Sequence, residues 1–368
     1  MKKLKIRYLF LLPALLFLGG CTESDETPAV TTDRGEIVLS GGGVGLTRAD
    51  APNGFPNEAS IGIVASVYDP ANKDEDDNVI LLWDSYPDIL NAQALATTVT
   101  NGVYSVKWGV DGNGKKYWPF DGGQLAFMAY SPHTDAYPLH ISLDTDSLKR
   151  LNFQLSPISD NTPDVMWASN NGTHTAYNKD VITESNGTYH SPTVLLGEFQ
   201  HALSRLTVEV QAEGNMNPNI VVTSLTVETT IRSAEIELTD GTVNLGEAVS
   251  TPYVYTLIDD DSGVAFKTQS IDFTVLLLPG TEDVTEVSVT LKDLQDQSDI
   301  RYTYAFMVPF FTNVDINTGK TLKLEQGKRT TTRIIVQSIG VPTPTPELDL
   351  KGVISDWEDR GKFGVTIN

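Results

Sequence analysis

The sequence is short of the residues on which covalent cross-links and most metal sites depend. Among 368 residues there is one cysteine, Cys21, so no disulfide can form within the chain. The five histidines are scattered singly, without a pair at helical metal-ligand spacing. A nucleophile elbow and a phosphate-binding glycine loop are also absent from the sequence. We therefore expect no metal, no cofactor and no enzymatic activity, and stability that comes from the burial of apolar side chains.

Basic residues are scarce as well. The chain has 26 Lys and Arg against 48 Asp and Glu, a formal charge of −22. Four of the basic residues and none of the acidic ones lie in residues 1–20, so the remainder carries −26. Nucleic acids and anionic membrane surfaces are bound through clustered Lys and Arg. The charge therefore argues against both as partners and favours solubility at a crowded surface.

The first 20 residues have the pattern of an export signal. Basic residues in the first seven positions precede an apolar stretch from Tyr8 to Leu18. The stretch ends in Leu18-Gly19-Gly20-Cys21, which resembles the lipobox of bacterial lipoproteins. That resemblance implies removal of residues 1–20, lipidation of Cys21 and attachment to the outer membrane. The alternatives are a buried cysteine in a hydrophobic stem and a transmembrane anchor, for which the stretch is short of the roughly 20 residues needed.

The segment after the cysteine, residues 22–34, is polar and acidic and predicts a flexible tether. Its acidic cluster, Glu23, Asp25 and Glu26, resembles the signal that sends some Bacteroidales lipoproteins to the outer face of the outer membrane. A solvated linker would have the same composition. We expect a surface-exposed protein.

From residue 35 onward the dominant pattern is alternation of apolar and polar residues. The runs Leu206 to Gln211 and Val287 to Lys292 alternate without a break, which is typical of antiparallel strands that bury one face. A third run, Leu125 to Tyr130, is apolar on both faces. Turn signals such as Asp240-Gly241 separate the runs. The sequence therefore predicts an all-β protein, and its one helical segment, Pro87 to Ala96, has a loop as the alternative.

The domain boundary has to be inferred from the strands, because no long linker divides the chain. Val194 to Phe199 closes one run of strands, and Leu203 to Gln211 opens a cleaner set. We place the division near residue 200. The predicted domains are residues 35–200 and 201–368, two antiparallel β-sandwiches in tandem.

Several distinctive short segments follow one another along the chain. They are Leu46-Thr47-Arg48-Ala49, Tyr117-Trp118-Pro119-Phe120-Asp121-Gly122, Leu125 to Pro132, Asp164-Val165-Met166-Trp167-Ala168, Phe199 to Leu206, and Val353-Ile354-Ser355-Asp356-Trp357. Together with the cysteine motif, the ordered set resembles the fimbrillin family, the two-domain subunits of type V pili in Bacteroidales and their fimbrillin-like relatives. The resemblance implies transthyretin-like β-sandwich domains and assembly with other fimbrillin subunits outside the cell.

The resemblance also implies a mechanism of assembly. In polymerising fimbrillins a trypsin-like protease cuts after an arginine beyond the first strand, and a strand from the next subunit fills the groove by β-strand addition. Here the removable first strand is residues 35–48, bracketed by Arg34 and Arg48. Its apolar residues are Ile37, Val38, Leu39, Val44 and Leu46. Cleavage after Arg48 would release the strand and leave Ala49 as the new N-terminus, whereas cleavage after Arg34 would remove only the tether. In a non-polymerising relative both arginines are solvated and the strand stays in place.

The C-terminal segment is the candidate donor strand. Phe363, Val365 and Ile367 alternate with polar residues or glycine in a short strand. This strand either donates to the next subunit or closes the second domain. Because it has few apolar side chains, we expect a weak donor, which argues against a stalk role and leaves tip, accessory and anchor roles open.

Two other features have a functional and a plain interpretation. Asp146-Ser147-Leu148 matches the Asp-Ser/Thr-apolar triad of Bacteroidales O-glycosylation, which makes Ser147 a predicted site. The acidic run Asp69 to Asn78 is interpreted as a solvated loop, with a calcium loop as the alternative. The leading hypothesis is a pilus subunit that serves adhesion. The alternative is a non-polymerising surface lipoprotein that binds host or bacterial glycans through exposed tryptophans.

Overall fold

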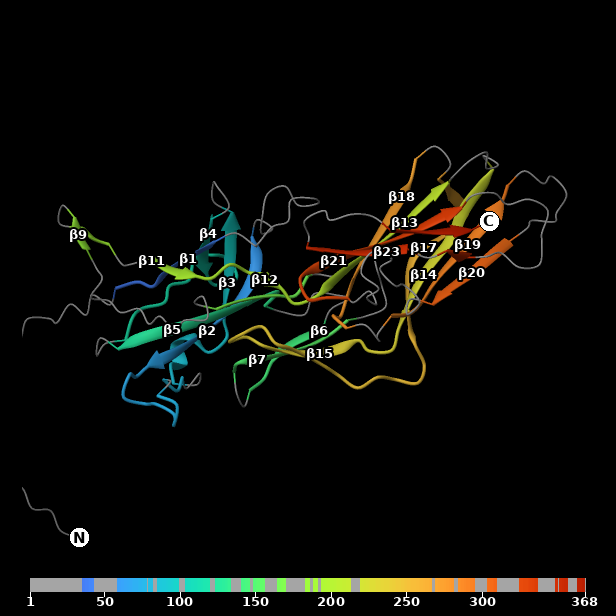
Figure 1. Cartoon of the computed structure of the whole chain (residues 1–368). Helices are drawn as coiled ribbons and strands as arrows, with labels where there is room; N and C mark the ends of the chain where they lie inside the picture. Colours follow the sequence, from blue (N-terminus) through green and yellow to red (C-terminus); the bar gives the residue numbers. More distant parts are fainter. Residues whose placement is uncertain are drawn as a thin grey trace, which may run out of the picture. The chain divides into compact units, whose positions relative to one another are not determined.

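The part of the chain that the structure describes is built almost entirely from β-strands (Figure 1). This confirms the predicted all-β fold class, while the arrangement as two tandem transthyretin-like domains stays a prediction. The structure is a computed structural model that describes residues 35–42, 58–77, 79–81, 85–98, 103–119, 123–133, 140–145, 148–155, 164–169, 183–185, 188–190, 193–212, 219–266, 269–280, 284–294, 303–309, 324–336, 348–349, 351–356 and 363–367. Within these residues no helix is long and apolar enough to cross a bilayer.

The largest sheet has eight strands, and all but one of its strand pairs are antiparallel. The parallel pair is β11 with β1, at one edge. In order across the sheet the strands are β11 (Thr193–Leu196), β1 (Val38–Gly42), β4 (Val103–Trp108), β3 (Ala92–Thr98), β2 (Ala59–Tyr68), β5 (Gln124–Ser131), β8 (Met166–Ser169) and β12 (Gln200–His201).

A four-stranded sheet draws its strands from both sides of residue 200. Its order is β16 (Val243–Leu245), β15 (Ser233–Glu237), β7 (Arg150–Gln154) and β6 (His140–Leu143). The ladder between β7 and β15, which lie side by side in Figure 1, therefore crosses the division that we place near residue 200. That division stays a prediction. A separate hairpin pairs β9 (Thr183–Ser185) with β10 (Thr188–His190).

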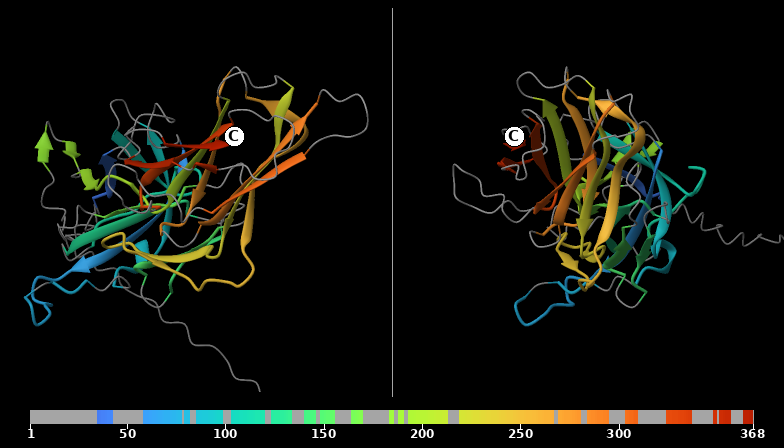
Figure 2. Two further views of the ribbon diagram at one scale, coloured as in Figure 1. Left: turned by 45° about the vertical axis from the view of Figure 1, so that its right-hand side comes forward. Right: turned by 90° about the vertical axis from the view of Figure 1, so that its right-hand side faces the viewer.

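The later part of the chain forms two further sheets. One is antiparallel and contains β17 (Tyr253–Ala265), β14 (Ile220–Thr229), β19 (Val284–Asp293) and β20 (Thr303–Pro309). The other contains β18 (Ile271–Leu277), β13 (Ser204–Ala212), β21 (Lys328–Val336), β24 (Phe363–Ile367) and β22 (Leu348–Asp349), with β23 (Lys351–Asp356) also paired to β21. Figure 2 shows the red C-terminal strands beside the yellow-green β13.

Three clusters of buried apolar side chains hold these sheets together. The first core contains Ile37, Leu39, Tyr104, Trp108, Trp118 and Phe127, among others, on one face of the eight-stranded sheet. The second core contains Leu206, Val208, Val227, Val289 and Ile334, among others, between the two later sheets. The third core contains Val64, Met128, Tyr130, Phe153 and Ile236, among others, between the eight-stranded and four-stranded sheets.

Strand β5 contributes to two of these cores. Phe127 belongs to the first core, whereas Met128 and Tyr130 belong to the third. Successive side chains of a strand point to opposite faces, so a strand with a core on each side must be apolar throughout. This confirms the interpretation of Leu125 to Tyr130 as a strand buried on both faces.

The predicted helix from Pro87 to Ala96 is wrong beyond its first turn. A 3₁₀ helix, η1 (Pro87–Ile89), ends at residue 89, and β3 begins at Ala92. Ala94 and Ala96 are buried in the first core, and β3 pairs on both sides with β2 and β4. Alanine favours helix locally, but pairing between two strands overrides that preference.

Candidate functional site

The first described strand, β1, is an inner strand of the eight-stranded sheet. It runs parallel to β11, with Val38 opposite Thr193, and antiparallel to β4, with Gly42 opposite Val103. Its backbone is therefore paired along both edges. Removing β1 would leave a gap between two strands, lined by backbone groups that have lost their partners.

The side chains of this segment alternate as the sequence predicts for a strand that covers a core. Ile37 and Leu39 are 1% and 0% exposed and belong to the first core. Val38, between them, is 41% exposed. The buried pair would leave two apolar pockets if the strand were released.

The residues just before β1 are held by the segment that follows β4. The amide of Ile37 donates to the carbonyl of Lys116 at 2.7 Å, and the amide of Trp118 donates to the carbonyl of Gly35 at 3.1 Å. The indole Nε1 of Trp108 donates to the carbonyl of Ile37 at 2.8 Å. Two hydrogen bonds with the segment after β4 and one from the last residue of β4 thus fix the register of the chain entering β1.

An exposed ion pair adds to these contacts. Lys115 Nζ lies 2.9 Å from Glu36 Oε2, with both side chains more than one-third exposed. The hydrogen bond to Glu36, and then its negative charge, raise the pKa of Lys115. Because solvent screens an exposed pair, its contribution to stability is small.

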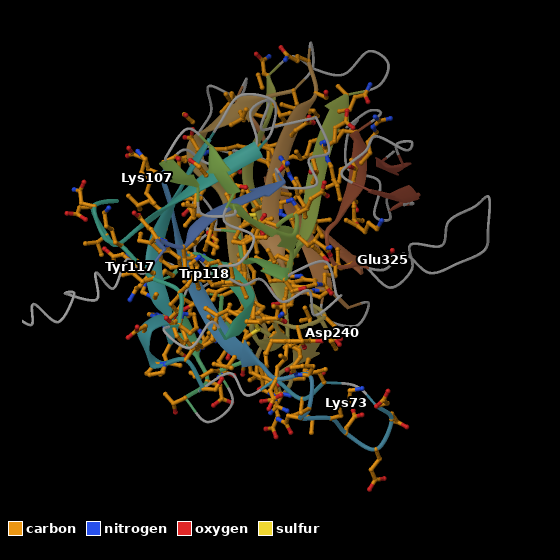
Figure 3. All side chains as sticks on the ribbon, turned by 90° about the vertical axis from the view of Figure 1, so that its left-hand side faces the viewer. Lys73, Lys107, Tyr117, Trp118, Asp240 and Glu325 are labelled. Carbon is orange, nitrogen blue, oxygen red and sulfur yellow. The ribbon has the colours of Figure 1, made fainter. Side chains whose placement is uncertain are left out.

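The place that β1 occupies between β11 and β4 is called the slot below. Aromatic rings line it. Tyr104 packs on Phe199 with ring centroids 5.4 Å apart, and Trp118 meets Phe127 edge-on at 6.2 Å. Burial raises the pKa of the Tyr104 phenol, whose hydroxyl lies 3.5 Å from the carbonyl of Gly197. Figure 3 labels Trp118 and its neighbour Tyr117, of which Trp118 is buried and Tyr117 is 36% exposed.

Strand β11 depends on β1. Among the strands that the structure describes, β11 has β1 as its one ladder partner, through four residue pairs from Val38–Thr193 to Gly41–Leu196. Release of β1 would leave β11 without this ladder, while Leu196 and Phe199 stay buried in the first core and the amide of Gly197 still donates to the carbonyl of Ser169 at 3.0 Å. Of the two strands that border the resulting groove, β4 would stay in the sheet, while β11 would be loosely held.

The other predicted site residues fall into two groups. Cys21, Arg34, Val44, Leu46, Arg48, Ala49 and Ser147 lie outside the residues that the structure describes. Phe363, Val365 and Ile367 lie in β24, which pairs in parallel with β21 and antiparallel with β22 of the same chain. Lipidation, processing and glycosylation at the first group therefore stay predictions.

The remaining motifs are placed as follows. Trp108, Trp118 and Trp167 are buried, while Trp83 and Trp357 lie outside the described residues. His201 contacts the Asp164 carboxylate through its Nδ1 atom. In the acidic loop, Lys73 pairs with Asp77 at 2.8 Å. Within the described residues no group of three His, Cys, Asp or Glu could hold a metal ion.

Two parts of this slot escaped the sequence analysis. The indole of Trp108 reaches the backbone of the first strand, and β11 pairs with that strand in parallel. The aromatic motif at Tyr117-Trp118 was a usable signal, because it marks the segment that holds residues 35–37. The pairing with β11 spans about 150 positions and leaves no local pattern in the sequence.

Comparisons with known proteins bear on both the family and the fold. The sequence profile of the fimbrillin-like family matches residues 47–357. A candidate cell adhesion protein from Bacteroides uniformis is structurally similar, with a TM-score of 0.51, 16% identity, and coverage of 88% of this chain and 98% of that chain. A fimbrial protein from Bacteroides vulgatus has a TM-score of 0.50 at 14% identity, covering 88% and 99%. At such identities the two structures support the fold alone. None of the curated proteins matches this sequence.

Proposed function

The chain belongs to the fimbrillin-like family, and we propose that it is a structural subunit of a surface pilus that serves adhesion. In this proposal it is exported as a lipoprotein through Cys21 and assembles by donor-strand exchange after proteolytic cleavage. Its partners are other fimbrillin subunits, joined by β-strand addition. No catalytic step is part of the proposal.

The observation that carries the proposal is the place of β1 in the sheet. It is the first described strand, it lies between β11 and β4, and it buries Ile37 and Leu39 in an aromatic core. A segment near the end of a chain can leave a sheet without dragging other strands with it. An incoming strand that alternates apolar and polar residues would restore the same ladders and fill the same pockets.

The processing step in the proposal is cleavage after Arg48. A cut there separates residues 35–48, with the buried Ile37 and Leu39, from the chain that begins at Ala49. A cut after Arg34 leaves β1 covalently attached to β2 and opens no groove. In both cases the lipid on Cys21 leaves with the released fragment, so processing also detaches the subunit from the membrane.

The donor in the proposal is the C-terminal strand with Phe363, Val365 and Ile367. Within its own chain this strand pairs with β21 over Thr332–Val336 and with β22 over two residues. Donation would require release of both ladders. Because donor strands compete with these internal ladders, we expect assembly to be slow and to depend on the cut.

A competition experiment tests the proposal. Purified chain is nicked with trypsin and incubated with an excess of a peptide of residues 35–48, and filament formation is followed by light scattering and electron microscopy. We expect the peptide to reoccupy the slot and to block assembly. The same peptide with Leu39→Asp should not block, because a charge cannot enter the pocket that Leu39 fills. Nicked chain that never associates, or that is blocked equally by both peptides, would contradict strand exchange.

A second candidate function is a surface lipoprotein that binds glycan and does not polymerise. The observation that favours it is the pairing of β24 inside its own chain, which leaves no free donor strand among the described residues. In that case the arginines stay uncut and β1 stays in place. Nicked chain would then remain monomeric at all concentrations and keep residues 35–48 bound.

A further inference from the structure

The outward face of the sheet β16-β15-β7-β6 carries two cross-strand rows of polar residues. One row is His140, Gln154, Ser233 and Gly246, and the other is Ser142, Asn152, Glu235 and Asn244. Residues between them on the same strands, such as Ile141, Phe153 and Ala234, are buried in the third core. The sheet therefore has one apolar face that packs inward and one polar face that is open to solvent.

These rows line a shallow hollow of about 630 Å³. That volume is in the range of sites for small ligands. At Gly246 the backbone lies close to Ser233, because a Cβ at this position would overlap the Ser233 hydroxyl. Besides the polar side chains of the two rows, the lining includes Ile141, Phe153, Ala234 and Leu245.

The hollow is nearly uncharged although the chain is strongly acidic. Among the described lining residues Glu235 is the one carboxylate, and its Oε1 lies 3.6 Å from Nε of Arg150. No lysine or arginine is among these lining residues. A bound metal cation would require several carboxylates, and an anion would require a basic side chain or a group of backbone amides. The lining therefore fits an uncharged ligand.

Arg232 holds the side-chain amide of Gln154 in place. In the amide orientation that suits its surroundings, the Gln154 oxygen accepts hydrogen bonds from Nε and Nη2 of Arg232, each at 2.8 Å. The Arg232 guanidinium is in turn 4.3 Å from the centroid of the Tyr253 ring. The side chain of Gln154 lies on the same face of β7 as that of Asn152, two residues earlier. An ordered polar side chain of this kind loses little conformational entropy when it binds.

We propose that this face binds a short neutral saccharide, whose hydroxyl groups exchange hydrogen bonds with the amide and hydroxyl side chains of the two rows. The inference rests on the adhesive part of the proposed function and is independent of strand exchange. A peptide strand would instead add to a sheet edge through its main chain and fill apolar pockets. The polar rows lie on the face of the sheet, which favours the saccharide.

The experiment uses the full chain and isothermal titration calorimetry with soluble mannan, galactan and β-glucan as neutral probes. Heparin and polysialic acid serve as charged probes. We expect at least one neutral glycan to bind, with an affinity that does not change with salt because no ion pair forms. The double variant Asn152→Ala/Asn244→Ala should weaken binding about tenfold or more through lost hydrogen bonds. The matched variant Asn113→Ala, in an exposed turn of the eight-stranded sheet, should bind as the unaltered chain does.

Three results would overturn the inference: no neutral glycan binds, the double variant binds as tightly as the unaltered chain, or binding is confined to the charged probes and is lost with salt. Asn152 and Asn244 are both exposed, so the double variant should keep its thermal unfolding midpoint. Assembly after nicking separates the two proposals. A double variant that assembles normally but no longer binds glycan supports this site, and a chain that binds glycan but never assembles contradicts the pilus role alone.

Discussion

The first and second cores differ in composition. The aromatic members of the first core are Tyr86, Tyr104, Trp108, Trp118, Phe127 and Phe199, and five alanines, Ala65, Ala94, Ala96, Ala129 and Ala168, make room for the rings. The second core is built mainly from valine, leucine and isoleucine, with Tyr255 and Phe266 as its buried aromatic members. Both cores are well buried. They also differ in the contacts by which they hold their strands.

Aromatic side chains with polar atoms hold the backbone around β1. Trp108 donates to the carbonyl of Ile37, and Tyr86 donates to the carbonyl of Tyr117 at 2.5 Å. In the second core, β13 and β21 are joined by a ladder of eight residue pairs, whereas β1 has four with β11 and three with β4. The first core thus holds β1 by short ladders and a few local contacts, whereas in the second core β13 and β21 are joined by one long ladder.

The energies agree with a strand that can be lost. Burying Ile37 and Leu39 contributes about 1.5–3 kcal/mol each. Small domains are stable by about 5–15 kcal/mol in total. Loss of β1 should therefore weaken the first core severely without unfolding the second. A refilled slot would recover most of that stability, which gives the cut subunit a reason to associate.

The largest expected effect comes from cutting after Arg48 and removing residues 35–48. We expect amides of β11 and β4 to lose protection from hydrogen exchange, because both strands lose ladder partners. Amides of β14 and β19 should keep their protection, since their ladder belongs to the second core. Hydrogen exchange with mass spectrometry measures both regions in one sample. An equal loss of protection in both regions would contradict the difference between the two cores.

The next effect is that of Leu39→Ala. Removing a fully buried leucine should lower the free energy of unfolding by roughly 2–5 kcal/mol, as measured by denaturant titration. Val38→Ala on the exposed side of the strand is the matched control and should change it by about 0.5 kcal/mol or less. Leu206→Ala in the second core should cost a similar amount to Leu39→Ala. After nicking, however, Leu39→Ala alone should speed the release of residues 35–48.

A smaller effect is expected from Trp108→Phe. This change removes the indole donor to Ile37 and should lower stability by about 1 kcal/mol beyond the loss of ring volume. Trp167→Phe is the matched control, because the buried Nε1 of Trp167 has no hydrogen-bond partner within the described part of the chain. The readout is the dissociation rate of the nicked fragment, which should rise in Trp108→Phe and stay unchanged in Trp167→Phe. Equal rates in the two variants would contradict a role for the indole in holding β1.

The smallest effect concerns the pH dependence of stability that His133 contributes, just after the end of β5. Burial lowers the pKa of His133 below its ordinary value, and a hydrogen bond to the Asn91 carbonyl opposes this in part. Among the described residues its buried Nδ1 has no hydrogen-bond partner, and its ring stacks on Tyr130. The unfolded chain therefore takes up a proton at higher pH than the folded chain, so stability should fall as pH drops through about 6.5 toward the lowered pKa.

Thermal unfolding between pH 7.5 and 5.5 measures this effect. The variant His133→Gln should lose part of the pH dependence in that range. His140→Gln, at an exposed position of β6, is the control and should retain it. A pH dependence of stability that is the same in all three chains would contradict a role for His133.

Alternation along the sequence predicts several of the strands. The runs Leu206 to Gln211 and Val287 to Lys292 lie inside β13 and β19, and the doubly apolar run lies inside β5. The alanines of β3 favour a helix by their own preference, which is why the sequence predicts one there. In the structure they form a strand because β3 pairs with β2 and β4. The parallel pairing of β1 with β11 and the ladder between β7 and β15 join distant segments, and a periodic pattern carries no information on such partners.

The most direct measurement of the central claim is the N-terminus of the assembled form. Filaments isolated from cells that produce this chain are dissociated and analysed by N-terminal sequencing and intact mass. We predict subunits that begin at Ala49 and carry neither the lipid of Cys21 nor residues 35–48. Filaments whose subunits retain residues 35–48 would contradict removal of the first strand as the step that opens the slot.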